Sequence, residues 1–116
     1  MKKLTNIDGL TIEERKAIAE FAEHLKERFG NIITDIILFG SKVRGESSKY
    51  SDIDILIVLA KTSWEIKKGI SELAAQENLK YNVIISTVRY DSATWDAPVV
   101  KASPFAKTVK EEGVWL

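Results

Sequence analysis

Two aspartates separated by one residue are the side chains best suited to chemistry in this sequence. Asp52 and Asp54 stand at the start of an apolar run, and because side chains alternate along a strand, both project from the same face. Neighbouring carboxylates repel each other, and burying them without a counter-charge is costly. A hard cation such as Mg²⁺ relieves the repulsion and shares its remaining coordination sites with water and substrate phosphates. The pair therefore predicts metal-dependent phosphate chemistry.

A Gly-Ser turn stands ten residues before the first aspartate. Gly40 has no Cβ, so its backbone can approach a phosphate closely. Ser41 is expected to open a short helical segment whose N–H groups, with the hydroxyl, can hold phosphate oxygens. Arg44 follows three residues later and lies near the same face, where it could contact phosphate or form a salt bridge within the fold. Alone this would be an ordinary strand-to-helix turn; close to a pair of aspartates, it fits the phosphate chemistry that they predict.

The elements that must position these residues are predicted from apolar periodicity and helix-capping signals. A capping box at Thr11–Glu14 opens a helix that ends at Gly30, and a second box at 62–65 opens a helix through about residue 76. Ser103 and Pro104 begin a last helix that Gly113 closes. Strands are expected over 32–39, 53–59 and 81–88, with a short helical segment over 40–45, a polar loop over 46–51, an unpatterned stretch over 89–102 and an apolar tail over 114–116.

This order of elements predicts a single domain over residues 1–116. The fold class is α/β (α+β), a small mixed β-sheet flanked by helices. The apolar tail could fold back onto the core or dock on another chain. His24 falls among charged residues of the first helix and is expected on a solvated face.

The composition excludes several classes of protein. The 17 basic and 17 acidic residues cancel, which argues against a general nucleic-acid or membrane-surface binder and leaves nucleic acid only as a conceivable acceptor. The chain has no cysteine, so disulfides and thiolate metal sites are excluded. No apolar run reaches the length of a membrane span, and a cytoplasmic protein is the expectation.

The spacing of Gly40-Ser41 and Asp52-x-Asp54 resembles the signature of the polymerase-β-like nucleotidyltransferase superfamily. With Arg44 included, it resembles more closely the minimal nucleotidyltransferases, the MntA-like antitoxin family of small prokaryotic domains often encoded beside a HEPN-domain partner. The resemblance covers essentially the whole chain. It implies that Asp52 and Asp54 are catalytic and bind Mg²⁺. It also implies that Gly40, Ser41 and Arg44 contact ATP or another nucleoside triphosphate.

The chain departs from this family at one position. Active members generally carry a third carboxylate on the later core strand, facing the aspartate pair. The strand expected over 81–88 contains no Asp or Glu, and Asn82 is the best-aligned residue and a weak candidate metal ligand, with Ser86 a lesser choice. An amide can coordinate a metal weakly but cannot accept a proton. Glu72 or Glu77 could substitute only if the fold brought one of them across.

Three functions follow from the resemblance and this departure. The first is a Mg²⁺-dependent nucleotidyltransferase that moves AMP from ATP onto a hydroxyl, with a HEPN-type partner protein as the acceptor. The second is a nucleotide-binding module with weakened catalysis that acts by covering a partner. The third is the catalytic subunit of a larger nucleotidyltransferase assembly, either with a partner or as a homo-oligomer.

Overall fold

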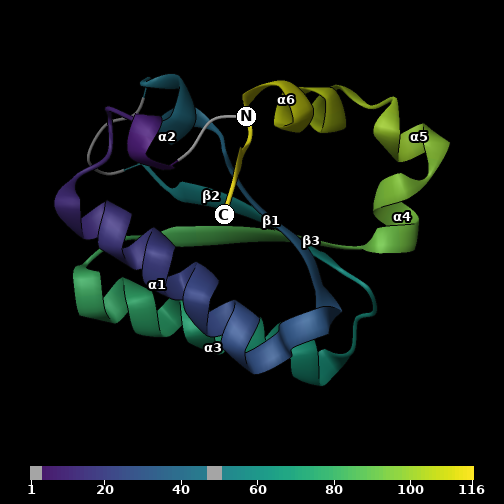
Figure 1. The fold of residues 1–116 in the computed structure, drawn as a ribbon, viewed down its shortest axis with the longest axis horizontal. Coiled ribbons are helices and arrows are strands. Elements are labelled where there is room, and N and C mark those ends of the chain that lie inside the picture. Colours follow the sequence, from purple (N-terminus) through teal and green to yellow (C-terminus); the bar gives the residue numbers. More distant parts are fainter. Residues whose placement is uncertain (1–3, 47–50) are drawn as a thin grey trace.

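The strands form one four-stranded mixed sheet in the computed structural model, which describes residues 4–46 and 51–116. The order is β3-β2-β1-β4, with β1 at Ile33–Phe39, β2 at Ile53–Leu59, β3 at Ile85–Asp91 and β4 at Val114–Trp115. β1 is antiparallel to both of its neighbours, whereas β2 and β3 are parallel (Figure 1). The mixed sheet with flanking helices confirms the predicted fold class.

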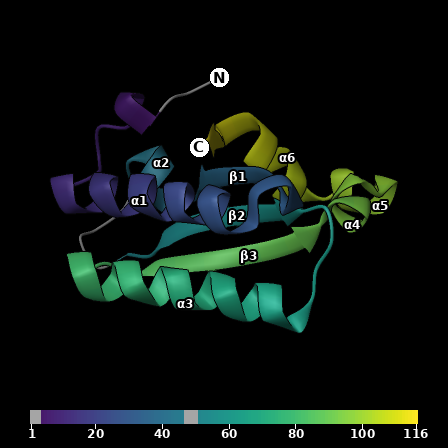
Figure 2. The same ribbon diagram turned by 60° about the horizontal axis from the view of Figure 1, so that its bottom comes forward.

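Two long helices cover one face of the sheet (Figure 2). They are α1 at Ile12–Phe29 and α3 at Trp64–Tyr81. Thr11 caps α1 in the capping box predicted from the sequence, and a 3₁₀ turn stands on either side of this helix, at Leu4–Asn6 and Gly30–Ile32. Every second residue of β2 is fully buried against this helical layer: Ile53, Ile55, Ile57 and Leu59.

The other face of the sheet is covered by the C-terminal part of the chain. Here α4 at Ser92–Asp96, α5 at Pro98–Lys101 and α6 at Pro104–Glu112 follow β3. A smaller apolar cluster joins Leu56 and Val58 of β2 to Val109 of α6. Phe39, Trp95 and Phe105 pack edge-to-face beside it. The alternation along β2 places Asp54 on this second face.

The strand expected over 81–88 begins later, so its predicted start is wrong. Helix α3 continues to Tyr81, and Asn82 caps its C-terminus in the left-handed conformation, with φ 54° and ψ 51°. Asparagine adopts this conformation more readily than most residues. The side chain of Asn78 then accepts a hydrogen bond from the N–H of Ile85 at 2.8 Å, which fixes the turn into β3. Asn82 therefore lies outside the strand on which it was expected.

Other expectations are corrected in detail. Ser63 caps α3, so the second capping box does not begin at Thr62. The stretch without a pattern contains the end of β3 and two short helices. The apolar tail folds back: Val114 and Trp115 pair with β1, and the Leu116 N–H donates to the Ile36 carbonyl at 2.9 Å. Most of the polar loop, residues 47–50, lies outside the described part of the chain.

His24 does not lie on a solvated face. It is half-buried, and its Nδ1 is 3.2 Å from a Glu77 carboxylate oxygen that projects from α3. The periodicity of α1 alone could not reveal this, because the partner stands 53 positions later in the sequence. Among the described helices, none has both the length and the apolarity needed to cross a bilayer.

A buried ion pair attaches the short helix α2, at Ser41–Arg44, to the start of α1. Lys42 is 1% exposed, and its Nζ lies 2.6 Å from Glu14 Oε2. The other oxygen of Glu14 accepts a hydrogen bond from the Thr11 N–H at 2.9 Å in the capping box. One carboxylate therefore holds both the beginning of α1 and the turn that follows β1.

Replacing Lys42 by Met is expected to destabilise the fold by about 3–5 kcal/mol, because Glu14 would keep a buried charge without its partner. Urea unfolding measures the change. In the double variant Lys42→Met/Glu14→Gln, the amide can still accept the Thr11 hydrogen bond and no charge is stranded. This variant should recover much of the loss; a simple sum of the two single effects would contradict the ion-pair interpretation.

Candidate active site

The Gly-Ser turn and the aspartate pair meet because β1 and β2 run antiparallel. The carboxyl end of β1 lies beside the amino end of β2, and Phe39 pairs with Asp54. Gly40 is the next residue, and Ser41 begins α2 directly after it. The motifs that the sequence separates by ten residues therefore lie together at one end of the sheet, as the sequence-based hypothesis requires.

Gly40 lies against the carboxylate of Asp54. Its backbone has φ 88° and ψ −160°, a conformation that residues other than glycine rarely adopt. A Cβ added at Gly40 would stand 2.3 Å from Asp54 Oδ2, well inside van der Waals contact. The structure therefore requires glycine here for two reasons, the backbone conformation and the space that the carboxylate occupies.

The two carboxylates differ in their surroundings. Asp54 is half-buried, and Asp52 is exposed. Burial, and then the charge of Asp52, raise the pKa of Asp54 above its ordinary value, while the charge of Arg44 acts in the opposite direction. These carboxylates therefore interact, and the ionised pair is stabilised by a nearby cation. Hard oxygen donors of this kind fit Mg²⁺, so Asp52 and Asp54 are suited to hold it.

Arg44 forms two ion pairs within the fold. Its Nε donates to Glu46 and its terminal nitrogen donates to Glu112 of α6, each at 3.1 Å. The sequence was compatible with two roles for Arg44, a phosphate contact or a salt bridge within the fold. The structure contains the salt bridge. The pair with Glu112 links α2 to α6, and the positive charge of Arg44 remains close enough to act on Asp54.

The position beside Asp54 on the neighbouring strand belongs to Ser86. The two residues pair in the parallel register of β2 and β3, so they lie on the same face. In the described part of β3, this face carries Ser86, Val88 and Tyr90 and no carboxylate. Asp91 pairs with Leu59 at the far end of the sheet, where it caps α4. The third carboxylate of the active family members thus has no counterpart at this position.

Glu72 and Glu77 do not replace the missing carboxylate. Both project from α3, which covers the opposite face of the sheet. Glu72 is paired with Arg28 at 3.8 Å, and Glu77 with His24 at 3.2 Å. Neither side chain is therefore placed to help Asp52 and Asp54.

A cavity of about 650 Å³ lies between the start of α1, the turn from α3 into β3, and Ser51. This volume is typical of a small-molecule site. Ser51, which directly precedes Asp52, forms part of its wall, but neither Asp52 nor Asp54 is among its described lining residues. The described residues that line it are Thr11, Glu13, Glu14, Ser51, Tyr81, Asn82, Val83 and Ile84. Asn82 thus lines a cavity near the start of α1, and the strand residue beside Asp54 is Ser86.

Comparison with known proteins identifies the class to which this fold and site belong. Residues 18–116 match the nucleotidyltransferase domain family, so the chain belongs to that family and is a nucleotidyltransferase. It is 35% identical over 102 residues to a Methanocaldococcus jannaschii protein named "Putative protein adenylyltransferase MJ0604", a match that covers 88% of this chain and 96% of the relative.

Two further likenesses support this result. The protein adenylyltransferase MntA of Thermococcus cleftensis is 47% identical over 49 residues, which are 41% of this chain and 48% of that protein. A crystal structure of a toxin–antitoxin with AMP-PNP superposes with a TM-score of 0.56 at 24% identity, over 83% of this chain and 69% of the other. The structural likeness confirms the polymerase-β-like fold.

Replacing Gly40 by Ala is expected to remove nucleotide binding, because the new Cβ would displace the Asp54 carboxylate. The backbone strain would add about 1–3 kcal/mol of destabilisation. Gly45→Ala is the matched control: φ is also positive there, at 73°, but nothing lies within 4 Å of an added Cβ. Calorimetric titration with ATP and Mg²⁺ should give a large loss for the first variant and little change for the second. Equal affinities would contradict the steric role of Gly40.

Proposed function

We propose that this nucleotidyltransferase transfers AMP from ATP to a hydroxyl of a partner protein of the HEPN class, with Mg²⁺ held by Asp52 and Asp54. The observation that carries the proposal is the contact of the Gly40 turn with Asp54, which brings a phosphate-approaching backbone and a metal-binding carboxylate together. A protein acceptor is supported by the names of the relatives. One is a putative protein adenylyltransferase that aligns with 88% of this chain, and another is a protein adenylyltransferase.

In this reaction the acceptor oxygen forms a bond to the α-phosphorus of ATP. The bond from the α-phosphorus to the bridging oxygen breaks, and pyrophosphate leaves. Mg²⁺ at such a site neutralises charge on the triphosphate and orients it. Gly40 and Ser41 are proposed to contact the phosphates, Asp52 and Asp54 to hold the metal, and Arg44 to keep α2 in place through Glu46 and Glu112.

The hydroxyl proton has no carboxylate to receive it at the Ser86 position. We therefore propose that it passes to water. General-base assistance is worth typically ~10²–10⁴-fold in rate, and this chain would work without that contribution.

Asp54→Asn should abolish transfer of label from α-³²P-ATP to a purified partner protein of the HEPN class. The experiment includes γ-³²P-ATP, which should leave the acceptor unlabelled, since pyrophosphate carries the γ-phosphate away. Label from the γ-position would identify phosphorylation instead. Circular dichroism of the variant provides the control for folding, because Asn has the same shape as Asp.

A second candidate function follows from the absence of a carboxylate at Ser86. The chain would then bind ATP and Mg²⁺ without transferring AMP, and would act by covering its partner. Absence of label on every candidate acceptor, together with ATP binding that Asp54→Asn removes, would favour this binding module over the transferase.

Ser86→Asp is expected to raise the rate of AMP transfer by ~10-fold or more, because the new carboxylate would stand beside Asp54 and could accept the proton. Asn82→Asp introduces the same charge at the helix cap, outside the strand, and should leave the rate near its original value. Initial rates at saturating ATP and Mg²⁺ compare the two variants. A larger gain for Asn82→Asp would contradict the register-based assignment.

A further inference from the structure

Three side chains with metal-binding donors lie together in the helical layer, away from Asp52 and Asp54. Glu20 and His24 stand one turn apart on α1, so both point toward the same side. Glu77 of α3 faces them from the neighbouring helix. One donor atom from each residue lies within 4.8 Å of the other two. The sheet separates this cluster from the face that carries Asp54.

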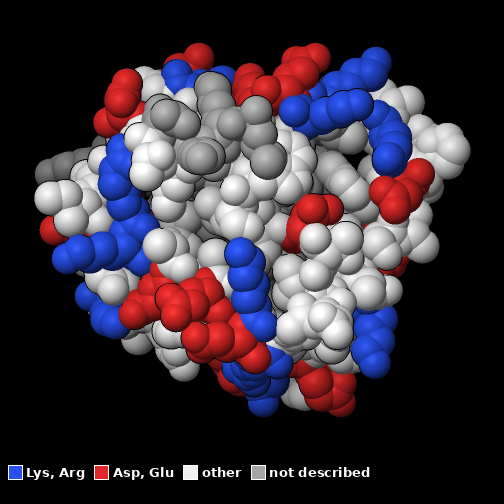
Figure 3. All heavy atoms as spheres, in the orientation of Figure 1, with Lys and Arg blue, Asp and Glu red and all other residues white. Residues whose placement is uncertain are grey.

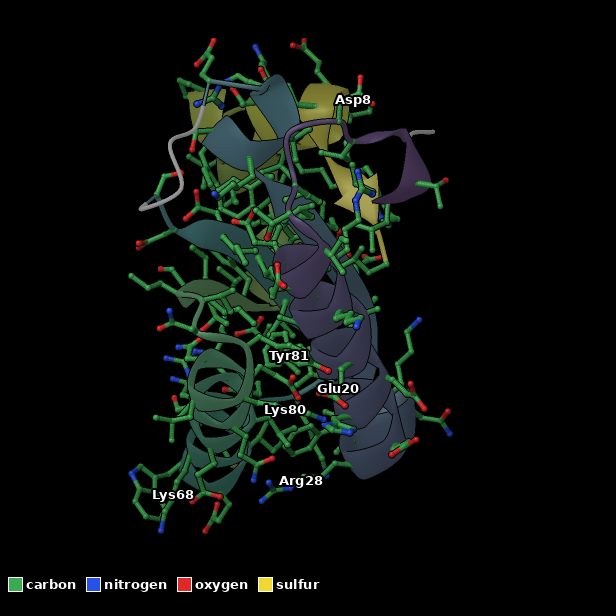
Figure 4. The ribbon with its side chains drawn as sticks, turned by 90° about the vertical axis from the view of Figure 1, so that its left-hand side faces the viewer. Asp8, Glu20, Arg28, Lys68, Lys80 and Tyr81 are labelled. Atoms are coloured by element: carbon green, nitrogen blue, oxygen red, sulfur yellow. The ribbon has the colours of Figure 1, made fainter. Side chains whose placement is uncertain are left out.

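Two carboxylate oxygens in the cluster are buried and have no hydrogen-bond partner. The Glu77 side chain is 2% exposed; its Oε1 contacts His24, whereas its Oε2 accepts nothing. Glu20 Oε1 accepts a hydrogen bond from Lys80 Nζ at 2.7 Å, whereas Glu20 Oε2 is buried and accepts no hydrogen bond of good geometry, although Glu77 and Tyr81 also act on the Glu20 carboxylate. Figure 4 shows Glu20 of α1 with Lys80 and Tyr81 of α3 across the space between the helices. Such unpaired acceptors cost free energy in a folded protein.

A proton or a metal cation could satisfy these oxygens. Burial, followed by the neighbouring Glu20 carboxylate, raises the pKa of Glu77 to about 7, so a proton held between the two carboxylates is one solution. Such a proton would lie between the two carboxylates and would leave the His24 imidazole on Glu77 Oε1, 3.2 Å away. One imidazole nitrogen and two carboxylate oxygens instead form a ligand set that suits metals with an affinity for imidazole.

We propose that Glu20, His24 and Glu77 form a binding site for a divalent transition metal of the Zn²⁺ type. Zinc binds imidazole nitrogen and carboxylate oxygen at about 2.0–2.2 Å, so tetrahedral ligands lie roughly 3.3–3.5 Å apart. Small side-chain movements would bring the present donors to that separation. Water would complete the coordination, as in other sites with three protein ligands.

The surroundings of the cluster allow a metal to enter and remain. Glu20 and His24 are 24% and 36% exposed at their side chains, which opens the cluster to solvent, while Glu77 forms its buried side. Lys80 can stay on Glu20 Oε1, because the metal would use Oε2. Acidic side chains gather on the surface over α1 and α3 in Figure 3 and favour an approaching cation.

Bound metal would connect α1 directly to α3, the two helices that cover the sheet on one face. The site would therefore act on stability and on the spacing of these helices, and would have no direct part in transfer chemistry. Because metal binding to the folded state stabilises it by mass action, the midpoint of thermal unfolding should rise with Zn²⁺ concentration.

The single histidine of the chain makes a direct test possible. The tag-free protein, labelled with ¹⁵N, is titrated with Zn²⁺ while the imidazole nitrogens are observed by NMR. We expect one equivalent of Zn²⁺ to shift a ring nitrogen of His24. The shift should persist in Asp52→Asn/Asp54→Asn, because that pair lies on the other face of the sheet. This experiment needs no substitution within the cluster, so a variant that fails to fold cannot obscure the result.

Variants then assign the ligands by calorimetric titration with Zn²⁺. Glu77→Gln and His24→Asn should each weaken binding by at least ~10-fold, a loss that even an outer-shell partner of a metal can cause. Glu23→Gln removes the same charge from an exposed position of α1 and should leave the affinity unchanged. An imidazole that does not respond to excess Zn²⁺, or a Glu77→Gln variant with unchanged affinity, would overturn the proposal and leave the shared proton as the occupant.

Discussion

The close approach of Gly40 to Asp54 is the constraint on which the site depends. The antiparallel register of β1 and β2 fixes it, since Phe39 pairs with Asp54 and the next residue must turn away over the carboxylate. A side chain on the turn at that point would collide with the Asp54 carboxylate. A half-buried aspartate with a second aspartate two residues before it then needs a compensating cation. The glycine and the proposed metal site thus both depend on this strand pairing.

The strand β2 has two functions that its alternation keeps apart. Residues on one face fill the main core beneath α1 and α3, and residues on the other face carry Asp54 and the smaller cluster around Val109. Because both faces are covered, a carboxylate on this strand rests on a rigid support, and a small displacement of a ligand already weakens a metal site. The Lys42–Glu14 ion pair likewise supports the Gly-Ser turn, because it joins α2 to the start of α1.

The sequence was sufficient for features that depend on local spacing. The limits of β2 and the caps of α1 and α6 follow from alternation and capping signals, and the structure agrees. Features that depend on distant pairs were missed: Lys42 with Glu14, and His24 with Glu77. Asn82 was misplaced because its β-branched neighbours resemble a strand, whereas its own left-handed conformation ends a helix. The partner of Asp54 on β3 could be identified only from the strand register.

The position of β2 in the sheet also has a consequence for local motion. Hydrogen-bonded neighbours flank it on both sides, and all of its residues except Asp54 are buried. Its amide protons should therefore exchange with solvent only when much of the molecule opens, whereas those of β3 and β4 can exchange through fraying at the edges of the sheet. Asp54 belongs to this protected strand, so edge fluctuations that accompany the arrival or departure of a partner would leave its carboxylate in place.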